Sequence, residues 1–121
     1  MTLEPDVDRW LRETNPPLES TLRRVTELIL ASDQRLTAYL KNGTVQFAFE
    51  GDLAAFVQPK ANRVSLMFYR GAKIPGDFPH LEGDGPTARF LRFDDLADVR
   101  SKAKELRALA KAWCRLVAPP S

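Results

Sequence analysis

Basic residues recur at helical spacing in the C-terminal quarter of the chain. Five of them, here called the basic row, share one side of an expected helix: Arg100, Lys104, Arg107, Lys111 and Arg115. No acidic residue stands three or four positions from any of them, so ion pairs within the helix cannot neutralise the row. The row can contact an anionic ligand or partner, pair with acids elsewhere in the domain, or remain solvated, which is the most frequent outcome. Nucleic acid is not the favoured partner.

Acidic residues alternate with glycine in the segment 82–86. Glu82 and Asp84 are the candidate metal ligands, because hard cations prefer carboxylate oxygens. The spacing does not match an EF-hand loop. Acidic and glycine residues also form turns, and a turn is the preferred interpretation.

Two further side chains could take part in catalysis, but neither stands in a catalytic motif. His80 lies in a loop rich in proline and glycine, with no recognisable serine or cysteine nucleophile nearby in sequence. Cys114 lies beside the apolar side of the expected last helix, where a buried or half-buried thiol is typical. We therefore predict no catalytic residue and no cofactor. A hydrolase that uses His80 or scattered carboxylates remains an alternative.

The composition indicates one globular domain covering residues 1–121. Hydrophobic residues make up 44% and charged residues 28%, which excludes disordered and fibrous classes. A single cysteine excludes an internal disulfide framework, and a single histidine excludes a two-histidine metal site in one chain. The uncharged runs, of which Leu53–Pro59 is one and Asn42–Phe49 the longest, are too short to span a membrane, and Met1–Asp6 resembles no secretory signal. We expect a cytoplasmic protein without membrane contact.

Apolar periodicity predicts three helices. The first opens at Pro5 or Asp6, and the second extends to about residues 32–33, with Asn15 as its N-cap and Pro16 at its first position. A long last helix opens at Asp94-Asp95. Its expected apolar side consists of Leu96, Val99, Ala103, Leu106, Leu109, Ala110, Trp113, Leu116 and Val117.

The segment between the helices predicts five strands. Asn42-Gly43 favours a type I′ hairpin, and pairing outward from it places Leu40 opposite Val45 and Ala38 opposite Phe47, so the apolar residues share one face. The strand 53–57 is apolar on both faces, which favours a central position. Strands at 64–69 and 87–93 follow, separated by an irregular stretch. The expected fold is α+β, with a meander-like antiparallel sheet of about five strands, two N-terminal helices and one long C-terminal helix.

The sequence from residue 64 onward resembles the DUF1801 (YdhG-like) family. The resemblance is carried by Val64–Ala72, the segment Leu81–Pro86, Arg89 and Asp94–Leu96, and upstream by Val7–Leu11. It implies an antiparallel sheet flanked by helices. Some bacterial members are described as frataxin-like iron chaperones, so iron is implied by the resemblance alone. Pro86 and Phe90 stand where many relatives have lysine and histidine.

The leading functional hypothesis is a small binding module without catalysis of its own. Its ligand is a small anion, a metal ion or a protein, and a homodimer through a sheet edge or the long helix is an open alternative. The candidate ligand-binding residues are Tyr69, Arg70, Glu82, Gly83, Gly85 and Arg89.

The mild net charge of +2 conceals an uneven distribution. Residues 96–121 contain six basic and two acidic residues, whereas residues 1–95 contain twelve basic and fourteen acidic residues. The last helix is therefore basic and the body slightly acidic. An anionic partner on that helix is consistent with these numbers, and so is neutralisation by the body of the domain.

Overall fold

The protein has the expected α+β architecture. The structure, a computed structural model, describes residues 3–119, so Met1 and Thr2 of the expected N-terminal segment lie outside the described residues. The elements follow one another in this order: α1 (Pro5–Glu13), η1 (Pro16–Leu18), α2 (Glu19–Ser32), β1 (Thr37–Lys41), β2 (Thr44–Ala48), β3 (Asp52–Val57), β4 (Val64–Phe68), η2 (Gly71–Lys73), β5 (Arg89–Phe93) and α3 (Leu96–Val117).

The five strands form an antiparallel meander in the order β1-β2-β3-β4-β5. The hairpin register is confirmed: Leu40 pairs with Val45 and Ala38 with Phe47. Asn42 and Gly43 both have positive φ, as a type I′ turn requires. The doubly apolar strand β3 lies at the centre of the sheet, as predicted.

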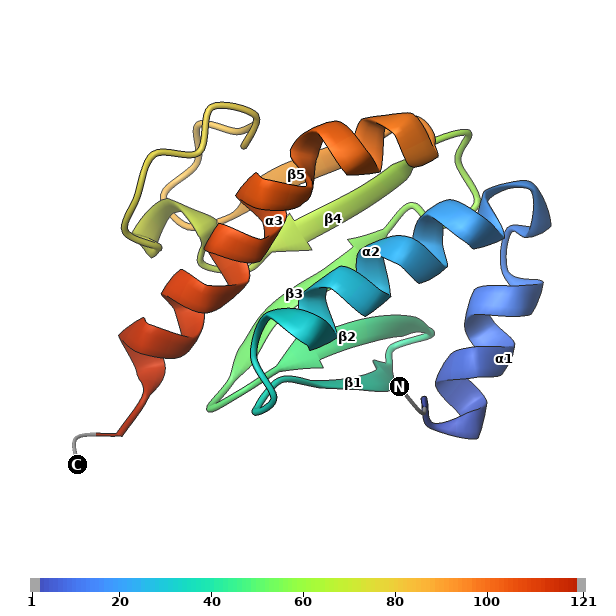
Figure 1. Ribbon diagram of the computed structural model, residues 1–121, viewed down its shortest axis with the longest axis horizontal. Coiled ribbons are helices and arrows are strands. Elements are labelled where there is room, and N and C mark those ends of the chain that lie inside the picture. Colours follow the sequence, from blue (N-terminus) through green and yellow to red (C-terminus); the bar gives the residue numbers. More distant parts are fainter. Residues whose placement is uncertain (1–2, 120–121) are drawn as a thin grey trace.

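Helices α2 and α3 lie side by side across one face of the sheet, whereas α1 lies near β1 and β2 (Figure 1). The core fills the space between this helical layer and the sheet. Its largest fully buried side chains include Phe47, Phe56 and Phe68 from the strands and Trp113 from α3. Burial under the helices, not exposure as a stacking surface, accounts for these strand aromatics.

The start of the second helix differs from the prediction. Pro16–Leu18 form a 3-10 turn, and α2 begins only at Glu19. The side chain of Asn15 does not cap the helix. Its Nδ2 donates instead to the carbonyls of Pro59 and Ala61, at 3.0 and 2.8 Å, and so fastens the β3–β4 turn. The capping interpretation was therefore wrong, because a tertiary contact uses the same side chain.

Two further details differ from the sequence prediction. Residues 87–88 precede β5 and do not belong to it. Leu96 and Leu116 do not join the apolar side of α3, because they remain 38% and 47% exposed. They stand in the first and last turns of α3, toward the two edges of its apolar side.

The junction between α2 and β1 contains an ion pair that is sensitive to pH. Arg35 donates from its side chain and from its backbone N–H to the Asp33 carboxylate, at 2.8 to 3.0 Å. These bonds hold the pKa of Asp33 well below its ordinary value of 3.8. Because folding lowers this pKa, the stabilisation is fully present above the ordinary value and is lost as the pH falls below it.

Replacing Asp33 with asparagine is expected to lower the free energy of unfolding by about 1 kcal/mol at neutral pH. The difference from wild type should shrink as the pH falls from about 5 to about 2, because the wild-type carboxylate then becomes protonated. Urea denaturation of both proteins across this pH range measures the difference in the free energy of unfolding. Asp84→Asn, at an exposed loop position, serves as the control. An equal loss at both ends of the range would show that the ion pair is not the cause.

Candidate anion-binding surface on the last helix

The five side chains of the basic row are all exposed on the outer side of α3. The opposite side of the helix carries Val99, Leu106, Leu109 and Trp113 into the core, which fixes the rotation of the helix about its axis. The helix begins at a capped end, because the Asp95 carboxylate accepts a bond of 2.9 Å from the backbone N–H of Asp98. Near its other end, Trp113 Nε1 donates to the Phe49 carbonyl at 3.0 Å. The row is thus held outward by a helix anchored at both ends.

Within residues 3–119, no member of the basic row forms a salt bridge or a side-chain hydrogen bond. Lys102 of the same helix provides the contrast. It donates to the Asp98 carboxylate at 3.2 Å and to the Arg92 carbonyl at 2.7 Å. Over the described residues, Asp98 of the same helix therefore pairs with Lys102, whereas the row has no acidic partner.

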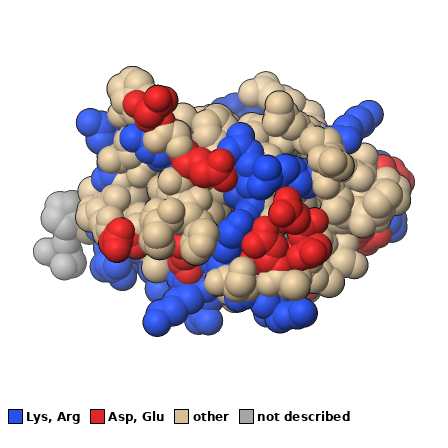
Figure 2. Space-filling model, turned by 90° about the horizontal axis from the view of Figure 1, so that it is seen from above, with Lys and Arg blue, Asp and Glu red and all other residues tan. Residues whose placement is uncertain are grey.

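A groove of about 610 Å³ runs along the row, here called the α3 groove. Its lining combines four members of the row with two alanines: Arg100, Ala103, Lys104, Arg107, Ala108 and Lys111. The sequence pattern places Ala103 on the apolar side of the helix and indicates neither alanine as a site residue. An alanine at an exposed helix position between basic residues, as at Ala108, is the signal that could have indicated a groove. Figure 2 shows blue side chains projecting along the lower edge of one face, with red ones among blue in its middle.

The other candidate ligand-binding residues serve mainly to hold the loop between β4 and β5. Tyr69 donates from its hydroxyl to Gln46 Oε1 at 2.5 Å, on the face of the sheet opposite the helices. Arg89 turns back to donate to the carbonyls of Gly85 and Ala88, at 2.7 and 2.8 Å. These contacts engage the Tyr69 hydroxyl and one guanidinium nitrogen of Arg89.

In the loop between β4 and β5, some of the candidate residues contact the rest of the domain and others are exposed to solvent. Gly83 has a φ of +127° and packs against Arg89, so its backbone conformation disfavours other residues. Gly85 faces open space, and Arg70 is exposed. The Glu82 carboxylate pairs with Arg92 at 3.1 Å, and its backbone bridges to Phe90. The hollows of about 320, 610 and 310 Å³ in the described residues are lined by none of Tyr69, Arg70 and the 82–85 loop.

The acidic residues do not form a metal site in the described part of the chain. No group of three or more histidine, cysteine, aspartate or glutamate side chains between residues 3 and 119 is arranged to hold a metal ion. Glu82 and Asp84 therefore have no third side chain of these four types arranged with them there.

His80 fastens its loop to α3. Its backbone N–H donates to Glu105 at 2.9 Å, and its Nδ1 lies 2.8 Å from the other oxygen of the same carboxylate. Glu105 is 10% exposed and lies beside a hollow of about 310 Å³, here called the Phe78 hollow. The only serine lining that hollow, Ser101, donates back to the Asp98 carbonyl at 2.9 Å. This arrangement ties a loop to a helix and presents no activated nucleophile.

Cys114 is fully buried between α2 and α3. Burial, together with the nearby Asp33 carboxylate, raises the pKa of its thiol to about 11. The thiolate needed for nucleophilic or metal chemistry is therefore disfavoured. The prediction of a packed thiol is confirmed.

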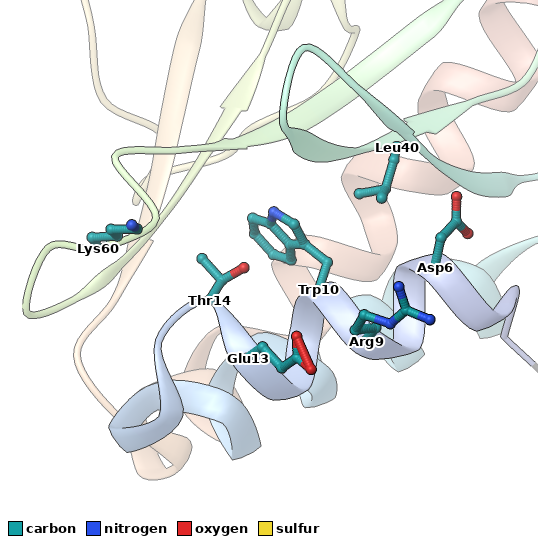
Figure 3. A pocket seen from close by; sticks show the side chains of 7 residues that line it. All are labelled: Asp6, Arg9, Trp10, Glu13, Thr14, Leu40 and Lys60. Carbon is teal, nitrogen blue, oxygen red and sulfur yellow. The ribbon is translucent and has the colours of Figure 1, made fainter.

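A second hollow, of about 320 Å³, lies between α1, β1 and the β3–β4 turn (Figure 3). The indole of Trp10 forms its floor, and Asp6, Arg9, Glu13 and Lys60 surround it. The indole is already engaged: it stacks on Phe56 with 5.8 Å between ring centroids, and Nε1 donates to the Gly43 carbonyl at 2.9 Å. Two acids and two bases give this hollow no net charge. It offers less to an ionic ligand than the α3 groove does.

Comparisons with known proteins add no family to these observations. No family model, no curated protein and no solved structure matches the chain. Among the helices of residues 3–119, none has the length and apolar composition needed to cross a membrane.

Proposed function

We propose that the protein is a non-catalytic cytoplasmic binding module that recognises a polyanionic partner through the basic row of α3. The observation that carries it is the absence, within residues 3–119, of any ion pair to the row's five exposed cations. Unpaired cations along one groove raise the local concentration of an anionic partner and contribute to its binding. The resemblance to the DUF1801 family stays a prediction, and no iron-binding role is carried over from it.

Reversing two charges in the middle of the row tests this function. The variant Arg107→Glu/Lys111→Glu is expected to bind heparin about tenfold more weakly than wild type, since it loses two contacts and adds two repulsions. The dependence of log affinity on log salt should become shallower by roughly two, one for each lost contact. Titration at several salt concentrations measures both quantities.

The matched control is Lys60→Glu/Lys73→Glu, which changes the net charge equally at exposed positions away from the row. It should retain most of the wild-type affinity. If both double variants lose affinity equally, only the net charge acts and the row is not the binding surface. Circular dichroism of each variant checks that the helical content equals that of wild type.

A further inference from the structure

The spacing of the basic row matches that of another α-helix. Successive members stand four, three, four and four residues apart. At about 1.5 Å per residue, they follow one another every 4.5 to 6 Å over roughly 22 Å. Carboxylates placed at the same intervals on a second α-helix are separated by the same distances along its axis. Each cation could then face one carboxylate without distortion of either helix.

The α3 groove is shaped for close approach of such a helix. Ala103 and Ala108 line the groove together with the basic side chains. Because alanine side chains are small, they leave room for another helix to approach the backbone of α3. Helices pack with their axes about 8–10 Å apart when the side chains at the contact are small enough to interdigitate. The groove therefore provides space as well as charge.

An apolar position adjoins the groove near its middle. The Phe78 hollow shares Lys104 and Ala108 with the groove, and Phe78 and Pro79 of the β4–β5 loop form its other side. An aliphatic side chain on a partner helix fits this chemistry. A phosphate does not, because Asp77 and Glu105 line the same hollow.

The surrounding acids also disfavour a nucleic-acid duplex. Asp94 and Asp95 are exposed immediately before α3, in addition to the two acids of the Phe78 hollow. A duplex carries phosphates on two strands and would bring some of them near these carboxylates. A helix with one acidic side presents a single line of charge. A second copy of this chain is disfavoured as well, since a two-fold contact would place one basic row against the other.

From this charge complementarity and the adjoining apolar hollow, we infer that the partner of the basic row is an acidic amphipathic α-helix of another protein. Its carboxylates lie along the α3 groove, and one aliphatic side chain enters the Phe78 hollow. This inference rests on the proposed function and adds the class of partner to it.

The test uses two fluorescein-labelled peptides of about 20 residues with identical composition. In the patterned peptide, glutamates repeat the four-three-four-four spacing and a leucine stands beside the central one. In the scattered peptide, the same residues are distributed around the helix. Fluorescence anisotropy with the full chain is expected to show about tenfold tighter binding of the patterned peptide. Arg107→Glu/Lys111→Glu should abolish this preference.

A second variant separates shape from charge. Ala108→Leu fills the space shared by the groove and the Phe78 hollow without changing any charge. It should weaken binding of the patterned peptide by about threefold to tenfold and leave heparin binding unchanged. Ala31→Leu, at an exposed alanine of α2, is the matched control and should change neither.

The outcomes distinguish the proposed polyanion-binding function from the inference that the partner is an acidic helix. Equal affinity for both peptides, with heparin binding intact, would overturn the helical partner and keep the polyanion-binding function. Tighter binding of a duplex DNA probe than of the patterned peptide would replace the helical partner with nucleic acid. Failure of wild type to bind heparin or either peptide would overturn the proposed function itself.

Discussion

Replacing Trp113 with alanine is expected to lower the free energy of unfolding by about 4 kcal/mol. The indole is 1% exposed and is the largest fully buried side chain in the protein. Its removal leaves a cavity between α3 and the sheet that neighbouring side chains cannot fill. It also leaves the Phe49 carbonyl without the donor that Nε1 supplies at 3.0 Å. Since small domains are stable by about 5–15 kcal/mol, a large share of the stability would be lost.

Two further variants separate the contributions of Trp113. Trp113→Phe keeps most of the buried volume but removes the Nε1 donor, so it should lose about 1–2 kcal/mol. Trp10→Ala removes the other indole, which is only half-buried over Phe56, and should lose less than Trp113→Ala. Urea denaturation followed by the fluorescence of the remaining tryptophan measures each variant. A loss below about 2 kcal/mol for Trp113→Ala would show that this contact is not central to the core.

The hairpin and the last helix were predictable because local and tertiary signals agree there. Asn42-Gly43 fixes the turn, and the alternation of Leu40, Val45 and Phe47 fixes the face that the helices cover. In α3, the cap at Asp95 and the apolar spacing act together. The local pattern gave a wrong prediction where a side chain suited to a cap makes a tertiary hydrogen bond instead. Asn15 has the chemistry of an N-cap, but its amide bonds the distant β3–β4 turn.

The candidate site was predictable only in its local features, because its other features depend on tertiary packing. The spacing of the basic row follows from helical periodicity, which is a local property. Whether acids from other elements neutralise it is a tertiary property, and only the structure shows that no member of the row has an acidic partner within residues 3–119. The α3 groove and the Phe78 hollow depend on how a loop packs against a helix. For the same reason, the sequence could not show that Tyr69 and Arg89 use their polar groups within the domain.

Replacing Gly71 with alanine is expected to lower the free energy of unfolding by about 2–3 kcal/mol. A Cβ at this buried position would stand 2.5 Å from Arg89 Cβ and 3.2 Å from the Arg89 backbone nitrogen. Either η2 or the start of β5 must then shift. The backbone of Gly71 does not lie in the left-handed region that favours glycine, so the cost is steric and not conformational.

A double-mutant cycle identifies the contact that makes alanine costly at position 71. In the Arg89→Gly background the closest clash is gone, so Gly71→Ala should cost at least about 1 kcal/mol less than it does in wild type. Gly85→Ala, in the same loop, is the control: its Cβ meets open space and its φ is not positive, so stability should change by no more than about 0.5 kcal/mol. Urea denaturation of the four members of the cycle gives the coupling energy. Additive losses would mean that strain elsewhere, and not the approach of η2 to β5, makes glycine necessary. A large coupling energy would instead show that the close contact between Gly71 and Arg89 is what requires glycine at the beginning of the β4–β5 loop, the segment that carries Phe78 to α3.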